Sequence, residues 1–328
     1  MEHKPNRKNT TIFARYYIIV VLCFFTCIKT SNAQQLSHFS QYMFNGFAIN
    51  PAYSGLNEVL NISLISRHQW TGIEGAPSTQ LLSAHSLFKK KHIGLGIMAI
   101  HDRIGIHKSL TLLSSYAYHI QLRDKMKLSF GLQLGFNQQN SDLSQVTGQL
   151  INIANDPKLL GAQYSRLSPE LGAGIYFKSE KLQLGFSVPK IAVNQVLDSD
   201  PLIEGFNETH YFLFISFFQD LNYNLAINPS ALFKYVAGAP LAPDVNLNLI
   251  INDVLWLGTS FRPVESIDFI TQMQLTPQLR LGYGYDFLLN DLADLRTGSH
   301  EILLSYLFKF TKSNVINPRR QHLKRRTK

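Results

Sequence analysis

The feature that most constrains this sequence is an alternation of apolar and polar residues that recurs along most of its length. Between Lys127 and Asn137, every second residue is a large apolar side chain, with serine, glycine or glutamine in between. A period of two is typical of β-strands with one apolar face. No later stretch reaches the roughly eighteen consecutive apolar residues of a spanning helix. The pattern therefore predicts an all-β chain without a helical membrane span.

The same period along the whole chain predicts about fourteen strands. The connections between them alternate, with long ones such as 102–108 separated by tight turns such as Asn252-Asp253. A transmembrane barrel has short periplasmic turns and long outer loops. The alternation therefore predicts a transmembrane antiparallel β-barrel with both termini in the periplasm. The predicted strands are 57–67, 79–88, 92–101, 109–122, 127–138, 169–178, 182–188, 208–219, 223–235, 244–251, 254–261, 267–275, 279–288 and 299–310.

The two ends of the chain differ in character from this body. Basic residues, an apolar run over 16–28 and small residues before Gln34 predict a signal peptide over 1–33, cleaved after Ala33. A retained anchor and a lipoprotein signal at Cys27 are alternatives, but the run is short for a spanning helix. The aromatic lead at 34–56 predicts a small element in the barrel lumen. We expect the outer-membrane barrel over 57–310 and a basic tail over 311–328.

Charge and cysteine content exclude several classes of function. The net charge of +9 comes from the leader and the tail, because the body between them is slightly acidic. The charge is therefore no sign of nucleic-acid binding. Both cysteines, Cys23 and Cys27, lie in the predicted signal peptide, so the mature chain has no thiol for a disulfide, a metal or a nucleophile. The basic tail predicts either a solvated segment or an arm that docks on an acidic partner.

Neighbouring histidines and acids could suggest acid–base chemistry, as at His101-Asp102 and His300-Glu301. Adjacent residues of a strand point to opposite faces, however, and no nucleophile stands at a suitable spacing. We therefore expect no catalytic residue, no cofactor and no metal site.

Pairs of glycines recur within the predicted strands. Gly94-Leu95-Gly96, Gly172-Ala173-Gly174 and Gly282-Tyr283-Gly284 lack the strand-to-helix context of a phosphate-binding loop. Glycine on the inner face of a barrel allows close packing of a lumenal element, and this is the use we expect.

Several motifs resemble one known family along essentially the whole predicted mature chain. The motifs are Phe39-Ser40-Gln41-Tyr42-Met43-Phe44-Asn45, Asn50-Pro51-Ala52-Tyr53-Ser54-Gly55, Arg67-His68-Gln69-Trp70, Gly75-Ala76-Pro77-Ser78-Thr79-Gln80, Ser83-Ala84-His85 and Gly298-Ser299-His300-Glu301-Ile302. Together with Asp102, they resemble the PorP/SprF family of outer-membrane proteins from Bacteroidetes, although this chain continues further past its last predicted strand than members usually do.

The resemblance implies a barrel that assists type IX protein secretion and, in gliding members, the export of surface adhesins. It implies no catalytic activity. The implied partners are outer-membrane lipid, the outer-membrane translocon, periplasmic ring or peptidoglycan-anchoring lipoproteins, and the C-terminal domain of a secreted cargo. The candidate family-motif or partner-contact residues are Phe39, Gln41, Tyr42, Asn45, Asn50, Pro51, Tyr53, Gly55, Arg67, Trp70, Pro77, His85, Asp102, His300 and Glu301.

Two other functions stay open on the sequence alone. Fourteen-stranded barrels with N-terminal plugs also include channels for apolar small molecules of the FadL type. A barrel of this kind can also serve only as a structural anchor for a periplasmic complex. The sequence shows no ring of pore-lining charges that would decide between these functions.

Overall fold

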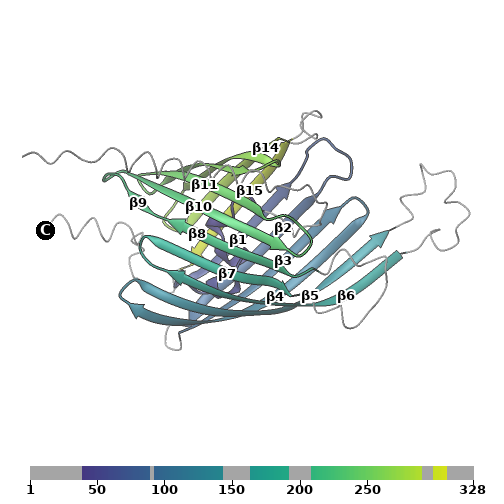
Figure 1. Ribbon diagram of the computed structural model, residues 1–328, viewed down its shortest axis with the longest axis horizontal. Coiled ribbons are helices and arrows are strands. Elements are labelled where there is room, and N and C mark those ends of the chain that lie inside the picture. Colours follow the sequence, from purple (N-terminus) through teal and green to yellow (C-terminus); the bar gives the residue numbers. More distant parts are fainter. Residues whose placement is uncertain (1–38, 89–91, 143–162, 192–207, 290–297, 309–328) are drawn as a thin grey trace, which may run out of the picture.

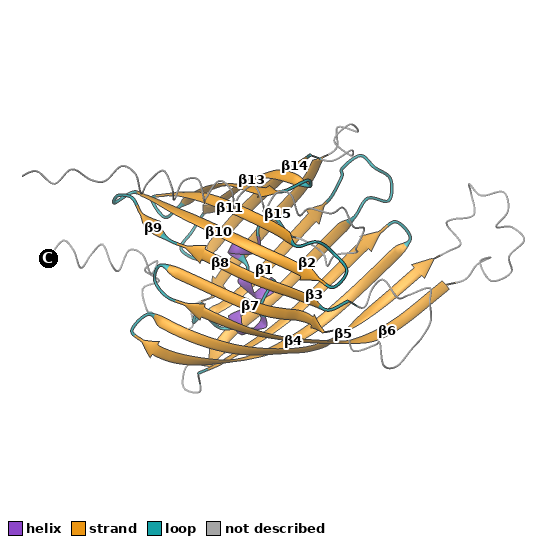
Figure 2. Cartoon of the chain, viewed as in Figure 1, coloured by secondary structure: helices purple, strands orange, loops and turns teal. Residues whose placement is uncertain are grey.

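The computed structural model describes residues 39–88, 92–142, 163–191, 208–289 and 298–308. Within this part, three short 3-10 helices precede a series of strands that join into one antiparallel sheet (Figures 1 and 2). None of the helices in the described ranges is long and apolar enough to cross a membrane. The predicted signal peptide and the predicted tail lie outside the described residues.

The described strands form a closed barrel of fourteen. The two-residue segment β9 continues β8 along the same edge of β10, so the two count as one strand of the barrel. The bounds are β1 (Leu60–His68), β2 (Ser78–Phe88), β3 (Ile93–Ile104), β4 (His107–Arg123), β5 (Met126–Asp142), β6 (Gln163–Lys178), β7 (Leu182–Ile191), β8 (His210–Phe217), β9 (Gln219–Asp220), β10 (Leu225–Val236), β11 (Ala242–Ile251), β12 (Leu255–Arg262), β13 (Ser266–Gln274), β14 (Leu279–Leu288) and β15 (Gly298–Phe308).

The first and last strands pair with each other and close the sheet. Their register runs from Leu60 opposite Phe308 to His68 opposite His300. Closure matters because hydrocarbon offers no partner to the N–H and C=O groups of an open edge. We call the barrel mouth at Leu60 and Phe308 the turn end, and the mouth at His68 and His300 the loop end.

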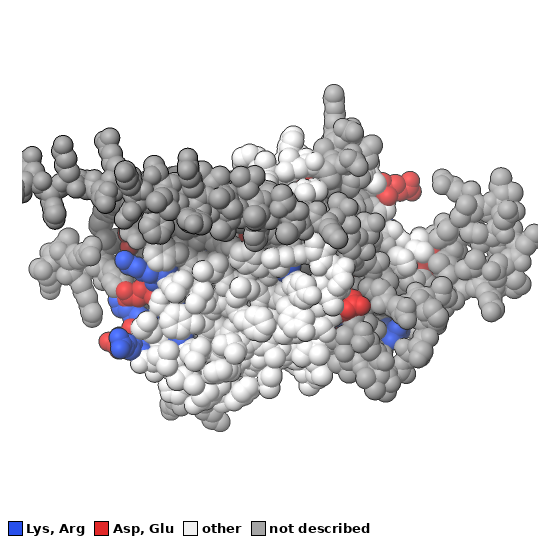
Figure 3. Space-filling view, viewed as in Figure 1, with Lys and Arg blue, Asp and Glu red and all other residues white. Residues whose placement is uncertain are grey.

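The two faces of the wall have opposite chemistry. In β4, Leu112, Tyr116 and Tyr118 are exposed on one face, whereas Ser115 and His119 on the other face are buried. On the visible face of the molecule, uncharged side chains cover the middle of the strands and charged ones gather toward the ends (Figure 3). Apolar side chains outside and polar ones inside are the arrangement of a barrel that faces lipid.

Each predicted strand has a counterpart in the barrel, but the prediction of a long connection at 102–108 was wrong. β3 ends at Ile104 and β4 begins at His107, so a two-residue turn joins them, and Gly105 takes the positive φ of +56° that this turn needs. The alternation of long and short connections therefore has two exceptions, here and between β12 and β13, where only residues 263–265 intervene. The tight turn at Asn252-Asp253 is confirmed, with φ values of 53° and 57°. β5 and β6 also extend into the predicted connection 139–168.

A charge on the outer face tests whether that face meets lipid. Leu132 is 65% exposed on β5, and Leu132→Arg should destabilise the barrel in vesicles by roughly 2–4 kcal/mol, because arginine would enter hydrocarbon. The measurement is denaturant unfolding of the purified chain in lipid vesicles. The control is Leu241→Arg, at an exposed residue outside the strands, which should change stability little. Equal effects of both substitutions would contradict a lipid-facing outer wall.

Candidate functional site

The residues that precede β1 fold into three single-turn helices, η1 (Tyr42–Phe44), η2 (Gly46–Ala48) and η3 (Pro51–Tyr53). Asn50 starts η3, because its side-chain Oδ1 accepts the backbone N–H of Ala52 at 2.9 Å and Pro51 supplies a suitable φ. Gly55 then takes a φ of +81°, which turns the chain toward β1. We call residues 39–56 the N-terminal segment.

The N-terminal segment lies inside the barrel and contacts strands on several sides of it (Figure 2). Two apolar clusters join it to the wall, so the segment fills the lumen between these strands. The first cluster contains Phe39, Phe47, Ile65, Leu81, Met98, Leu113 and Leu303. The second contains Tyr42, Ile49, Ala52, Leu56, Tyr176, Phe214 and Leu232.

Glycines of the wall let the segment approach the backbone. A Cβ at Gly94 would lie 1.9 Å from the carbonyl oxygen of Ser54, and one at Gly131 would lie 2.2 Å from the nitrogen of Ala52. Any side chain at either position would displace the segment. The predicted use of inner glycines is thus confirmed here, whereas Gly172 instead approaches the backbone of Pro189.

A single carboxylate binds the start of the segment. Glu301 of β15 accepts the backbone N–H of Ser40 at 2.8 Å and that of Gln41 at 2.9 Å, one with each oxygen. Glu301 is fully buried. Hydrogen bonds to a buried charged acceptor are among the stronger ones, so these two fix the segment in depth and in rotation.

The Ser40 side chain is held by two buried arginines. Its Oγ accepts from Arg67 at 2.7 Å and from Arg262 at 2.6 Å, and its hydroxyl donates to Asp286 at 2.8 Å. Arg67 also pairs with Glu301 at 3.1 Å. A serine hydroxyl has one proton and two lone pairs, so all its hydrogen-bonding capacity is used.

Further carboxylates from neighbouring strands neutralise the arginines. Arg262 pairs with Asp244 at 2.9 Å and also with Asp268. The guanidinium groups are thus enclosed by acids from four strands, β11, β13, β14 and β15, and each arginine is only 2% exposed. We call the following set the latch: Ser40, Arg67, Asp244, Arg262, Asp268, Asp286 and Glu301.

Tyr42 extends the contacts of the segment toward β11. Its hydroxyl lies 3.4 Å from a carboxylate oxygen of Asp244. Tyr42 is almost fully buried, and its hydroxyl can donate to this acid of the latch.

Farther along, the segment is held by neutral groups. Asn50 Nδ2 donates to the carbonyls of Ile175 at 3.0 Å and Phe186 at 3.2 Å, which belong to the neighbouring strands β6 and β7. His85 Nδ1 accepts the N–H of Gly55 at 3.0 Å. His119 Nε2 lies 2.8 Å from the carbonyl of Ser54. These two histidines orient backbone groups of the segment.

The segment crosses the lumen from one mouth to the other. Ser40 is held near the loop end by Glu301, the fourth residue of β15. Glu58, just past the segment, pairs with Lys127 at the start of β5, which is at the turn end. The described chain therefore begins near the loop end, whereas β1 begins and β15 ends at the turn end.

The structure brings most of the predicted site residues together. Phe39, Gln41, Tyr42, Asn45, Asn50 and Pro51 are buried in the segment, and Arg67 and Glu301 face each other across the β1–β15 seam. His85 contacts Gly55 and, through its ring, Tyr53.

Four predicted residues lie apart from the latch, toward the loop end. The N–H of Trp70 donates to the Ser299 hydroxyl at 3.3 Å, and the carbonyl of Pro77 accepts from Gln69. Asp102 accepts the hydroxyl of Thr79. His300 Nδ1 lies 2.7 Å from the hydroxyl of Tyr283, which is 41% exposed, so His300 points away from Glu301.

Sequence reasoning missed four residues of the latch, Asp244, Arg262, Asp268 and Asp286, and gave Ser40 only as part of a motif. Arg262 was assigned to a connection, because a charged residue at the end of an apolar strand resembles the start of a loop. The available signal was the alternation of Asp244, Asn246 and Asn248 on one face of β11. No described residues form a cluster of histidine, cysteine or acid side chains suited to a metal ion.

A comparison with protein-family models matches residues 31–306 to the family described as type IX secretion system membrane protein PorP/SprF. The chain belongs to the PorP/SprF family. The match covers the N-terminal segment and nearly the whole barrel, so both parts of the site are features of a PorP/SprF chain. A comparison with curated protein sequences finds no match.

Several solved structures are similar to this PorP/SprF chain in fold. The Omp33 protein of Acinetobacter baumannii shares 12% identity over 76% of this chain and 98% of its own, with a TM-score of 0.43. The toluene transporter TbuX of Ralstonia pickettii shares 8% over 81% and 93%, with a TM-score of 0.45. The CymD monoaromatic hydrocarbon channel shares 11% over 80% and 92%, with a TM-score of 0.44.

Removing the acid that binds the segment should release it. Glu301→Ala leaves two backbone N–H groups and part of the Arg67 charge unpaired, at a cost of about 3–5 kcal/mol. We expect limited proteolysis to cleave the N-terminal segment while the barrel keeps its heat-dependent gel mobility. Glu58→Ala is the control, because Glu58 is 45% exposed and its ion pair contributes little. A segment equally protected in both variants would show that the latch does not hold it.

Proposed function

We propose that this barrel is an accessory outer-membrane component of type IX secretion that helps to export or anchor particular surface proteins, such as gliding adhesins. The observation that carries the proposal is the family match over residues 31–306. The closed fourteen-stranded barrel supports an outer-membrane position. The proposed host is a Gram-negative member of the Bacteroidetes, with the predicted signal peptide directing the chain to its outer membrane.

The filled lumen supports a scaffolding function over transport. The N-terminal segment contacts the wall through both apolar clusters and through the latch, so moving it would uncover buried charges. A barrel with a fixed interior is suited to present its two mouths to other proteins. We therefore propose that partners bind at the mouths and that the lumen itself carries nothing.

The proposed partners differ between the two mouths. At the loop end we propose contacts with the translocon and with the C-terminal domain of the cargo. At the turn end, where β15 finishes at Phe308, we propose that the basic tail meets periplasmic ring or peptidoglycan-anchoring lipoproteins. A periplasmic position of both termini stays a prediction. If the N-terminus is periplasmic, the residues that precede Ser40 must connect the periplasm to the loop end, where Ser40 is held.

Comparative proteomics of the cell surface and the medium tests the function. Deletion of the gene should remove one or a few surface proteins, and the wild-type gene should restore them. Complementation with Glu301→Ala, whose segment is released, should restore them less well than Glu58→Ala. An unchanged surface proteome in the deletion strain would refute the secretion role.

Planar bilayer recordings address the channel alternative separately. The wild-type barrel should give little or no steady conductance, because the segment occupies the lumen. Steady conductance, or uptake of apolar solutes into vesicles, would favour a channel. The control is Glu301→Ala, which should conduct more than wild type if the same segment blocks the pore.

A further inference from the structure

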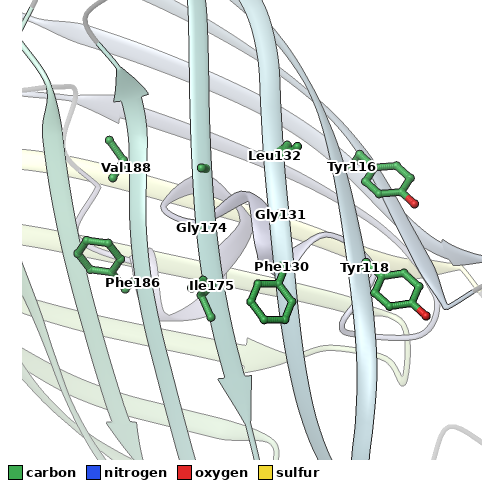
Figure 4. Close-up of a pocket in the computed structure, with 10 residues that line it drawn as sticks. Tyr116, Tyr118, Phe130, Gly131, Leu132, Gly174, Ile175, Phe186 and Val188 are labelled. Carbon is green, nitrogen blue, oxygen red and sulfur yellow. The ribbon is translucent and has the colours of Figure 1, made fainter.

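The outer wall of the barrel carries an apolar recess that belongs to neither the lumen nor the latch. It spans β4, β5, β6 and β7 and has a volume of about 450 Å³, within the usual range for ligand pockets (Figure 4). We call it the outer recess. It is lined by Tyr116, Tyr118, Phe130, Gly131, Leu132, Ala173, Gly174, Ile175, Phe186 and Val188.

The outer recess opens away from the lumen. Its side chains Tyr116, Tyr118, Phe130 and Phe186 are each between 43% and 47% exposed, although they are large and lie in the middle of strands. In Figure 4 these side chains lie in front of the strands and the N-terminal segment lies behind them. In a membrane, the recess therefore faces hydrocarbon.

A small residue surrounded by large ones creates the hollow. Ala173 lies between Leu132 on β5 and Val188 on β7 in the strand register, and one row along, Ile175 lies between Phe130 and Phe186. The methyl group of Ala173 leaves a gap between the neighbouring aromatic and branched side chains.

The N-terminal segment fixes the wall behind the recess. Asn50 donates from inside to the carbonyls of Ile175 and Phe186, two residues that line the recess outside. A Cβ at Gly174 would meet the Asn50 side chain, so the segment packs directly against this part of the wall. The recess is therefore preformed, and binding of an occupant carries no free-energy cost for ordering the wall.

Arg123 lies at a suitable distance from the outer recess to bind the headgroup of a lipid. Arg123 ends β4 and is exposed, and no ion pair of its side chain is seen among the described residues. It lies five residues beyond Tyr118, about 17 Å along the strand. Strand tilt shortens this distance along the membrane normal toward the roughly 15 Å of one hydrocarbon leaflet.

We propose that the outer recess binds one acyl chain of a membrane phospholipid, with the phosphate of that lipid held by Arg123. The lining has no charged side chain, and apart from the hydroxyls of Tyr116 and Tyr118 its side chains are apolar, which suits an alkyl chain. Burying an alkyl chain in a fixed recess instead of mobile lipid gains packing contacts. The lipid would belong to the leaflet at the turn end, because Arg123 precedes the β4–β5 turn. The proposal does not depend on the secretion role.

Lipid retention by the full-length purified barrel tests this proposal. The chain is loaded in vesicles of phosphatidylglycerol, extracted into detergent and analysed by native mass spectrometry. We expect one tightly retained phospholipid on the wild type. Ala173→Leu fills the recess with a side chain and should lower retention about tenfold, as expected from loss of buried apolar contacts. Arg123→Gln should lower it as well.

Matched controls separate the recess from general lipid contact. Ala84→Leu places the same side chain on the outer face of β2, and Arg103→Gln removes an exposed arginine near the opposite end of the barrel. Both should retain lipid as the wild type does, and heat-dependent gel mobility confirms that every variant is folded. Equal retention by Ala173→Leu and Ala84→Leu, or none by the wild type, would overturn the proposal.

Photo-crosslinking identifies the occupant in cells. A photoreactive amino acid at Tyr118, on the edge of the recess, should form an adduct with the mass of a phospholipid. An adduct with another protein would show instead that the recess is a protein-docking surface, and would refute the lipid assignment.

Discussion

A strand inside a bilayer can form backbone hydrogen bonds only with other strands, because hydrocarbon supplies neither donors nor acceptors. In this chain the requirement is met at the seam between β1 and β15, and the seam does more than close the sheet. Arg67 and Glu301 are opposite each other across it, and Glu301 also binds Ser40 and Gln41. The site that holds the N-terminal segment is thus complete only when the barrel is closed.

This coupling explains how charges are tolerated inside the wall. Arg67 and Arg262 are almost fully buried, which would be costly for isolated charges, but both form ion pairs with the surrounding acids and both donate to Ser40. The segment also reaches the opposite side of the barrel, where Asn50 binds β6 and β7 directly behind the outer recess. The inside of the molecule therefore shapes a surface that faces lipid.

Much of the barrel could be predicted because one face of each strand is apolar and the other polar, and this alternation depends only on local sequence. The prediction failed at 102–108 because β3 and β4 continue past the apolar band, where polar residues on both faces look like a loop. Arg262 was misassigned for a related reason. When one strand is considered alone, a charged residue at its end that points into the barrel cannot be distinguished from the first residue of a turn.

The sequence by itself determined the number of strands, the face of each that meets lipid and the aromatic character of the lead, since these follow from residues close together in the chain. The tertiary structure decided which residues form the latch. Ser40 and Asp286, which share a hydrogen bond, are 246 positions apart, and Asp244 and Arg262 lie on different strands. Only the closure of the barrel and its register bring them together, because the pairing of distant strands is set by the whole sheet and by no single segment.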